Sequence, residues 1–102
     1  MTADPISAYT LKLRGELTVS TIAKAHKKLA PALVSASEIC VDLHGATAAD
    51  LTLVQLILSA RHSAQRDGKT IHLAQPLPDS LMSELTRGGF LNSEDSFWTN
   101  GG

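Results

Sequence analysis

The sequence has a single cysteine, few aromatic residues and no excess of charge of either sign. Because Cys40 stands alone, the chain cannot form an internal disulfide. Lys and Arg number 9 and Asp and Glu number 10, so the net charge of -1 gives no electrostatic basis for binding nucleic acid or an anionic membrane. No run approaches the roughly 18 apolar residues of a membrane span, and no signal-peptide pattern opens the chain. We therefore expect a soluble cytoplasmic domain without direct membrane insertion.

The chain does contain enough apolar sequence for one modest core. Its 102 residues suit a single domain, and 43% of them are hydrophobic, as in globular rather than disordered proteins. The order of the predicted elements, β-β-α-β-α-β-α, is typical of an α/β fold. We place the domain at residues 6–91 and a C-terminal tail at residues 92–102. The pattern predicts strands near residues 6–13, 16–19, 38–43 and 70–74, and helices that begin near residues 20, 50 and 79.

Two segments of the predicted sheet have further signals. The apolar and β-branched run at residues 38–43 is typical of a strand that is covered on both faces and lies among parallel neighbours. Residues 44–49 are small and polar, so we expect a loop there. Asp42 and Asp50 flank this loop. We expect them to satisfy loop amides and to cap the next helix, rather than to act as a general acid and base.

Helix boundaries are marked by capping residues and by helix breakers. Thr18 or Ser20 can cap the first helix, and Pro31 should kink or end it, since proline cannot donate to the carbonyl of residue 27. Gly68 should end the second helix in a left-handed conformation, and Gly89 should stop the last one with its neighbour Gly88.

The helix after Asp50 carries two apolar stripes. Leu51, Val54 and Leu58 form one of them, roughly 130° around the axis from the other when each residue adds about 100°. A helix that covers one side of a small sheet needs only one such face. Either this second stripe is a partly exposed docking surface, or neighbouring helices cover it. The first stripe, which should face the sheet, contains Leu53, Leu56, Ile57, Ala60 and Ala64.

No group of residues assembles a catalytic or metal site. Cys40 lies mid-strand among apolar residues, where the pKa of a thiol tends to rise. The segment from Gly68 to Thr70 imitates the end of a phosphate-binding loop, but it follows a helix and precedes a strand, the reverse of that motif. We therefore expect no enzymatic activity, no cofactor and no metal. The histidines, which show no metal-ligand spacing, are His26, His44, His62 and His72.

Several motifs, in order along the chain, resemble the STAS domain. The resemblance covers about residues 6–91 and implies a small mixed β-sheet of about four strands with helices packed mainly on one face. The family includes anti-sigma factor antagonists and the cytoplasmic part of sulfate transporters. The motifs are Leu13-Arg14-Gly15-Glu16-Leu17-Thr18, Val41-Asp42-Leu43, Asp50 before an apolar helix, Gly68-Lys69 before a strand, and Gly88-Gly89-Phe90.

The position after Asp50 departs from the antagonist pattern. In the antagonists, the resemblance implies a Ser or Thr there, which a partner kinase phosphorylates. Here Leu51 takes that position, Thr52 follows about 100° further round the helix, and Thr47 is a weaker second candidate. A leucine at this point extends the apolar stripe, which favours a constitutive contact over a phosphate-gated one.

We therefore expect a non-enzymatic adaptor that docks a protein partner through residues 44–50 and the first turns of the following helix. By resemblance, the partner is an anti-sigma factor, a histidine-kinase-like protein or a member of a signalling complex such as that of chemotaxis. An accessory subunit of a lipid ABC transporter is an alternative, and a small enzyme or nucleotide-binding domain is a third. The expected contact residues are His44, Asp50, Leu51, Thr52, Val54, Gln55 and Leu58.

Overall fold

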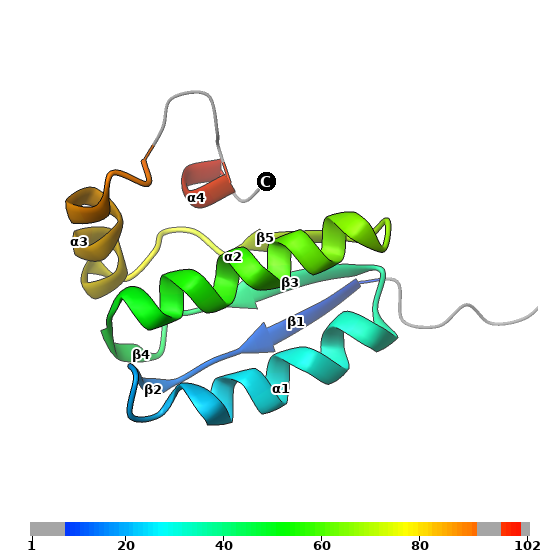
Figure 1. Ribbon diagram of the computed structural model, residues 1–102, viewed down its shortest axis with the longest axis horizontal. Coiled ribbons are helices and arrows are strands. Elements are labelled where there is room, and N and C mark those ends of the chain that lie inside the picture. The colour runs from blue at the N-terminus through cyan, green and yellow to red at the C-terminus, as the bar shows by residue number, and fades with distance from the viewer. Residues whose placement is uncertain (1–7, 92–96, 101–102) are drawn as a thin grey trace, which may run out of the picture.

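The computed structural model describes residues 8–91 and 97–100, which form five strands and four helices in the order β-β-α-β-β-α-β-α-α (Figure 1). The strands are β1 (Ala8–Lys12), β2 (Gly15–Leu17), β3 (Glu38–Asp42), β4 (Ala46–Ala49) and β5 (Thr70–Leu73). The helices are α1 (Ile22–Ser35), α2 (Leu51–Arg66), α3 (Asp79–Gly88) and the short α4 (Phe97–Asn100). The expected α/β fold class is confirmed.

The strands form two small sheets in which every pair of described strands is parallel. The larger sheet has the order β1-β3-β5, and β2 pairs with β4 in the smaller one. In the larger sheet Leu11, Val41 and Leu73 are register partners across the three strands. α1 and α2 lie side by side across one face of this sheet (Figure 1). The helices between strands provide the crossovers that parallel pairing requires.

The burial of β3 corrects one expectation from the sequence. Ile39 and Val41 are buried under the helices, whereas Glu38 is exposed and Cys40 and Asp42 are only half-buried. This alternation means that the strand is covered on one face, not on both as the apolar run predicted. The expected parallel neighbours, β1 and β5, are both present.

Residues 44–49 are not a loop throughout, as the sequence had indicated. Ala46–Ala49 form β4, whose register partners in β2 include Glu16 for Ala48. Alanine has a low strand propensity, so the segment carries no strand signal of its own. The pairing is supported where the two strands begin, because the Gly15 amide donates to the Gly45 carbonyl at 3.0 Å.

The first helix departs from expectation at both ends. Its N-cap is Thr21 rather than Thr18 or Ser20, and the Thr21 hydroxyl donates to the Glu16 carbonyl at 2.6 Å instead of capping the helix. α1 also continues through Pro31 to Ser35. The buried face around Pro31, with Leu29 and Ala32 in the core, explains how tertiary packing outweighs the lost hydrogen bond.

The other helix ends follow the sequence signals. Asp50 caps α2, and Gly68 lies just beyond that helix with a φ of 72°. Gly89 closes α3 with a φ of 74°, a left-handed conformation that glycine adopts without a steric cost.

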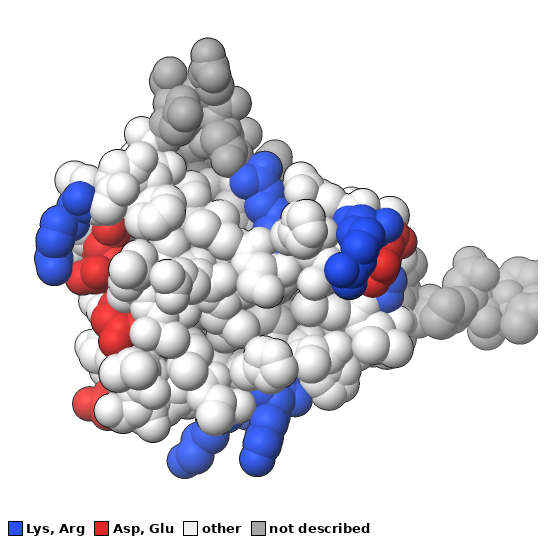
Figure 2. All heavy atoms as spheres, in the orientation of Figure 1, with Lys and Arg blue, Asp and Glu red and all other residues white. Residues whose placement is uncertain are grey.

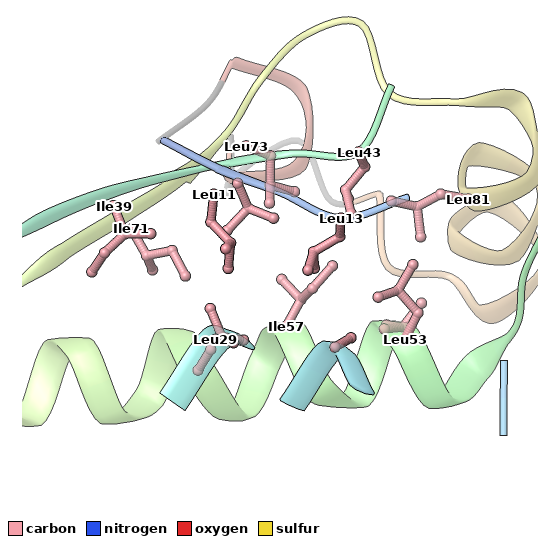
Figure 3. Packing of buried hydrophobic residues seen from close by; sticks show 14 of the residues in the cluster. Leu11, Leu13, Leu29, Ile39, Leu43, Leu53, Ile57, Ile71, Leu73 and Leu81 are labelled. Atoms are coloured by element: carbon pink, nitrogen blue, oxygen red, sulfur yellow. The ribbon is translucent and has the colours of Figure 1, made fainter. Parts of the chain in front are cut away.

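The core lies between the larger sheet and the two long helices. Figure 3 shows the strand side chains pointing toward the helices, where Leu29 of α1 and Leu53 and Ile57 of α2 meet them. This arrangement buries the first apolar stripe of α2 as predicted, except that Leu56 is only half-buried. The labelled strand side chains are Leu11, Ile39, Ile71 and Leu73, and Leu13 and Leu43 directly follow β1 and β3.

The short helix α4 adds an aromatic pair to this core. Phe97 and Trp98 are each 2% exposed, and their rings pack edge to face with centroids 5.1 Å apart. The Arg61 guanidinium of α2 lies 4.5 Å from the Phe97 ring centroid, and the Gln75 amide donates to the Trp98 carbonyl at 3.0 Å. The core therefore includes residues of the segment that we had assigned to a tail. The rest of that segment, 92–96 and 101–102, lies outside the described residues.

Candidate functional site

The second apolar stripe of α2 is not uniformly exposed. Leu51 is 46% exposed, but Val54 is 0% exposed and Leu58 is half-buried against the core. The expectation that Val54 lies on an exposed docking surface is therefore wrong. Only the first residue of the stripe, at the start of the helix, is open to a partner.

The chain's own later helices explain why the stripe is covered. α3 packs against α2, and its buried Leu81 and Leu85 belong to the same core cluster as Val54. Arg61 lies three residues after Leu58 on the same side of α2, and it is this arginine that stacks on Phe97 of α4. The sequence left two interpretations open, and coverage by neighbouring elements holds for the whole stripe except its first residue, Leu51.

Asp50 organises the exposed end of α2. Its Oδ1 accepts a hydrogen bond from the Thr52 amide at 2.9 Å and so caps the helix, as predicted. Its Oδ2 accepts a second bond, at 3.0 Å, from the amide of Val19 in the segment before α1. The bond from Val19, and then the bonds from Thr52, lower the pKa of Asp50, because they stabilise the carboxylate form.

The bond from Val19 places a second exposed apolar side chain next to this helix start. Val19 is 71% exposed, and its amide is bonded to the Asp50 carboxylate that directly precedes Leu51. We call the set Val19, Asp50, Leu51, Thr52 and Gln55 the Val19–Leu51 surface. Sequence reasoning missed Val19, although an apolar residue between Thr18 and Ser20, outside any predicted core stripe, was a usable signal.

The Val19–Leu51 surface continues into a hollow between α1 and α2. Thr52 and Gln55 line an open hollow of about 490 Å³ together with mainly uncharged residues of α1 and α2 and one cationic residue, Lys27. The same face of the molecule, over α1 and α2, carries its Lys, Arg, Asp and Glu side chains mainly at the margins (Figure 2). This hollow therefore lies in a surface that is largely uncharged.

His44 does not belong to this surface. It lies beyond the end of β3, beside Lys12 and Arg14 at a different hollow. Its Nδ1 is 3.1 Å from Asp42 Oδ1, and its amide donates to the same oxygen at 2.9 Å. Asp42 therefore satisfies a loop amide as predicted, whereas the expected grouping of His44 with the start of α2 is not found.

The two hydroxyls considered for phosphorylation differ in their surroundings. Thr47 is exposed on β4, while Thr52 is half-buried in the first turn of α2. The amide of Thr52 is engaged by Asp50, and its side chain lines the hollow between α1 and α2. Neither occupies the first residue of the helix, which is Leu51.

The residues that could have supported other chemistry are placed in structural roles. Burial, and after it the nearby Asp42 and Glu38 carboxylates, raises the pKa of the Cys40 thiol, which opposes thiolate formation. The Lys69 ammonium donates to the carbonyls of Leu33 and Val34 at the end of α1. Among the described residues, no three His, Cys, Asp or Glu side chains are grouped so that they could hold a metal ion.

These observations define a small parallel α/β domain whose second helix begins at an exposed apolar edge with an acidic cap. A family model described as "Mlab, STAS domain" matches residues 2–90. The chain belongs to this family of STAS domains, whose members are generally non-enzymatic. Comparison with curated proteins and with solved structures gave no match. Within residues 8–91 and 97–100, no helix has the length and apolar character needed to span a bilayer.

Proposed function

We propose that this chain is a non-enzymatic docking module that holds a protein partner in the cytoplasm through the Val19–Leu51 surface. The observation that carries the proposal is the 46% exposure of Leu51 at the first position of α2, in a helix whose other stripe residues are covered. A large apolar side chain beside an acidic cap provides an apolar centre with a polar rim, the usual anatomy of a protein interface.

The geometry around Asp50 supports this surface as a preformed one. The carboxylate accepts hydrogen bonds from the amides of Val19 and Thr52 and so ties the segment before α1 to the start of α2. A surface that is already ordered loses little conformational entropy when a partner binds. The side chains of Val19 and Leu51 would then act together as the apolar anchor of the contact.

The contact that we propose is constitutive. A phosphate ester needs a hydroxyl, and Leu51 has none at the position where the antagonists carry one. Thr52 is half-buried and points into the adjoining hollow, so a kinase suited to the first position of the helix would not reach it in the same way. The module therefore has no phosphate switch at the centre of its docking surface.

Our first candidate partner is a signalling protein of the anti-sigma factor or histidine-kinase-like class. The second candidate is a subunit of a membrane transporter such as a lipid-exporting ATPase, for which this chain would be a cytoplasmic accessory. Leu51 favours this second candidate, since a permanent subunit needs no switch in its contact surface.

Site-specific photocrosslinking in the native cell tests both the surface and the partner class. A benzophenone amino acid replaces Leu51 in one strain and Gln65, an exposed residue near the other end of α2, in a control strain. We expect one dominant adduct from position 51 and none of the same mass from position 65. Mass spectrometry of the adduct then separates a kinase-like protein from an ATPase subunit. Equal adducts from both positions would contradict the proposal.

Charge substitutions give an independent test of the same surface. In a pull-down without crosslinker, Leu51→Asp and Val19→Asp should each abolish recovery of the partner that crosslinking identified. Gln65→Asp should leave that recovery unchanged. All three positions are exposed, so circular dichroism and urea unfolding should show folded domains in every case. Full recovery of the partner with folded Leu51→Asp would rule out this surface.

A further inference from the structure

A second hollow lies on the sheet face opposite α1 and α2. It has a volume of about 410 Å³ and is lined by Lys12, Arg14, Asp42, His44 and Gly45. These residues come from the carboxyl ends of two neighbouring parallel strands, β1 and β3. Carboxyl ends of parallel strands are the edge of an α/β sheet where ligands commonly bind. The Val19–Leu51 surface shares none of these residues.

Strand alternation brings the charged side chains together. Leu11 and Leu13 of the β1 segment point into the core, so Lys12 and Arg14 point to the opposite face. The same alternation along β3 buries Val41 and Leu43, and it places Asp42 and His44 outward. Lys12 and Asp42 are direct register partners.

Backbone contacts hold Arg14 over the hollow. A Cβ atom at Gly45 would lie 2.9 Å from Arg14 Cγ, so the arginine stem rests closely on the glycine backbone. The neighbouring Gly15 amide donates to the Gly45 carbonyl at 3.0 Å, which ties the two segments together. The absence of a side chain at Gly45 thus lets Arg14 lie beside His44.

The charges in the hollow favour an oxyanion. Lys12 and Arg14 contribute two positive charges and Asp42 one negative charge, and protonation of His44 would add a third positive charge. Lys12, Arg14 and His44 are all exposed, whereas the Asp42 side chain is only 21% exposed, so the basic groups are the more accessible ones. His44 Nδ1 is paired with Asp42 Oδ1, so the other ring nitrogen, Nε2, is available to a ligand.

We propose that this hollow binds the phosphate group of a small phosphate monoester. The Arg14 guanidinium can donate two parallel hydrogen bonds to a phosphate, and the Lys12 ammonium adds a point charge. Protonated His44 donates from Nδ1 to Asp42 and from Nε2 to a phosphate oxygen. A phosphate dianion matches this set of cations better than a carboxylate, which carries a single charge. This site is separate from the proposed docking function and does not depend on it.

Amide chemical-shift titration of the labelled full chain tests the proposal, with inorganic phosphate and phenyl phosphate as the probes. We expect saturable shifts confined to residues 12–15 and 42–46 with both probes, and tighter binding than that of acetate at equal ionic strength. Shifts that fail to saturate, that spread over all exposed lysines, or that acetate reproduces with equal affinity would overturn the proposal.

Substitutions that remove one charge each then identify the groups involved. Arg14→Gln and Lys12→Gln should each weaken phosphate binding about tenfold, the loss expected for one charge-assisted hydrogen bond. Lys27→Gln on α1 removes the same charge from the opposite face and should leave the affinity unchanged. Equal weakening by Lys27→Gln, or an unchanged affinity in both Arg14→Gln and Lys12→Gln, would contradict this assignment.

Discussion

Leu51 and Val54 lie three residues apart on the same side of α2, yet one is 46% exposed and the other is completely buried. Both belong to a single apolar stripe, and nothing in their residue types distinguishes them. The difference arises from other parts of the chain, since the sheet and α3 cover Leu53 and Val54 near the start of α2 while Leu51, its first residue, stays half exposed. A second apolar stripe on a helix can therefore be partly internal cover and partly docking surface.

The same comparison separates stability from function along one helix. Burial at Val54 contributes to the free energy of folding, because the side chain is removed from water. Exposure at Leu51 contributes little to folding, and the proposed contact with a partner would give this apolar side chain a role in binding. The following predictions measure this separation, from the largest effect on stability to the smallest.

Val54→Asp should destabilise the domain most. It would place an unpaired carboxylate where the exposed fraction is zero, which we expect to cost more than about 4 kcal/mol of unfolding free energy. That is a large share of the about 5–15 kcal/mol that holds a domain folded. Urea unfolding followed by circular dichroism measures the loss. A folded variant whose urea midpoint lies near that of the unmodified chain would show that α3 does not bury the side chain at position 54.

Trp98→Ala should have the next largest effect on stability. Trp98 is 2% exposed and packs against Phe97, so its truncation should cost about 3–5 kcal/mol. Leu91→Ala, at a 38% exposed position, is the matched control and should change stability by less than about 1 kcal/mol. Comparable thermal midpoints for the two variants would contradict the placement of α4 in the core.

Asp50→Asn should flatten the dependence of stability on acid pH. The pKa of Asp50 is lowered in the folded state, first by the Val19 amide, so its carboxylate stabilises the fold above its unfolded pKa of about 3.9. That contribution is lost as pH falls through the folded pKa. Urea midpoints measured between about pH 5 and pH 2 should therefore decline less steeply in the variant. Asp67→Asn at the far end of α2 serves as the control. Parallel curves for Asp50→Asn and the unmodified chain would exclude a stabilising bond between the Val19 amide and the Asp50 carboxylate.

Leu51→Asp should have the smallest effect on stability. The side chain is nearly half exposed, and an acidic residue at the first position of a helix interacts favourably with the helix dipole. We expect a change within about 0.5 kcal/mol in urea unfolding. A loss as large as that of Trp98→Ala would mean that Leu51 is part of the core and not of a docking surface.

The sequence predicts the main elements of this fold well, because local signals determine them. Helical periodicity gives α2, Asp50 gives its cap, and Gly68 and Gly89 end their helices as expected. Local signals failed where tertiary contacts decide. β4 exists because β2 is there to pair with it, and α1 passes Pro31 because its inner face is buried.

The candidate site was predictable only in part for the same reason. Asp50 and Leu51 could be selected from their position before and at the start of an apolar helix. Val19 could not be grouped with them, since the bond that joins it to Asp50 spans 31 residues of sequence. Val54 was assigned wrongly, because helical periodicity defines a stripe but does not reveal which later segment covers it.

The central claim is that Leu51, the first residue of α2, is left exposed by the chain itself and is covered by a protein partner. The most direct test is the affinity between purified Leu51→Asp and the partner identified by crosslinking at that position, compared with the unmodified chain. We predict that the dissociation constant rises roughly tenfold or more while the domain stays folded. A dissociation constant within about twofold of the unmodified value would contradict the claim.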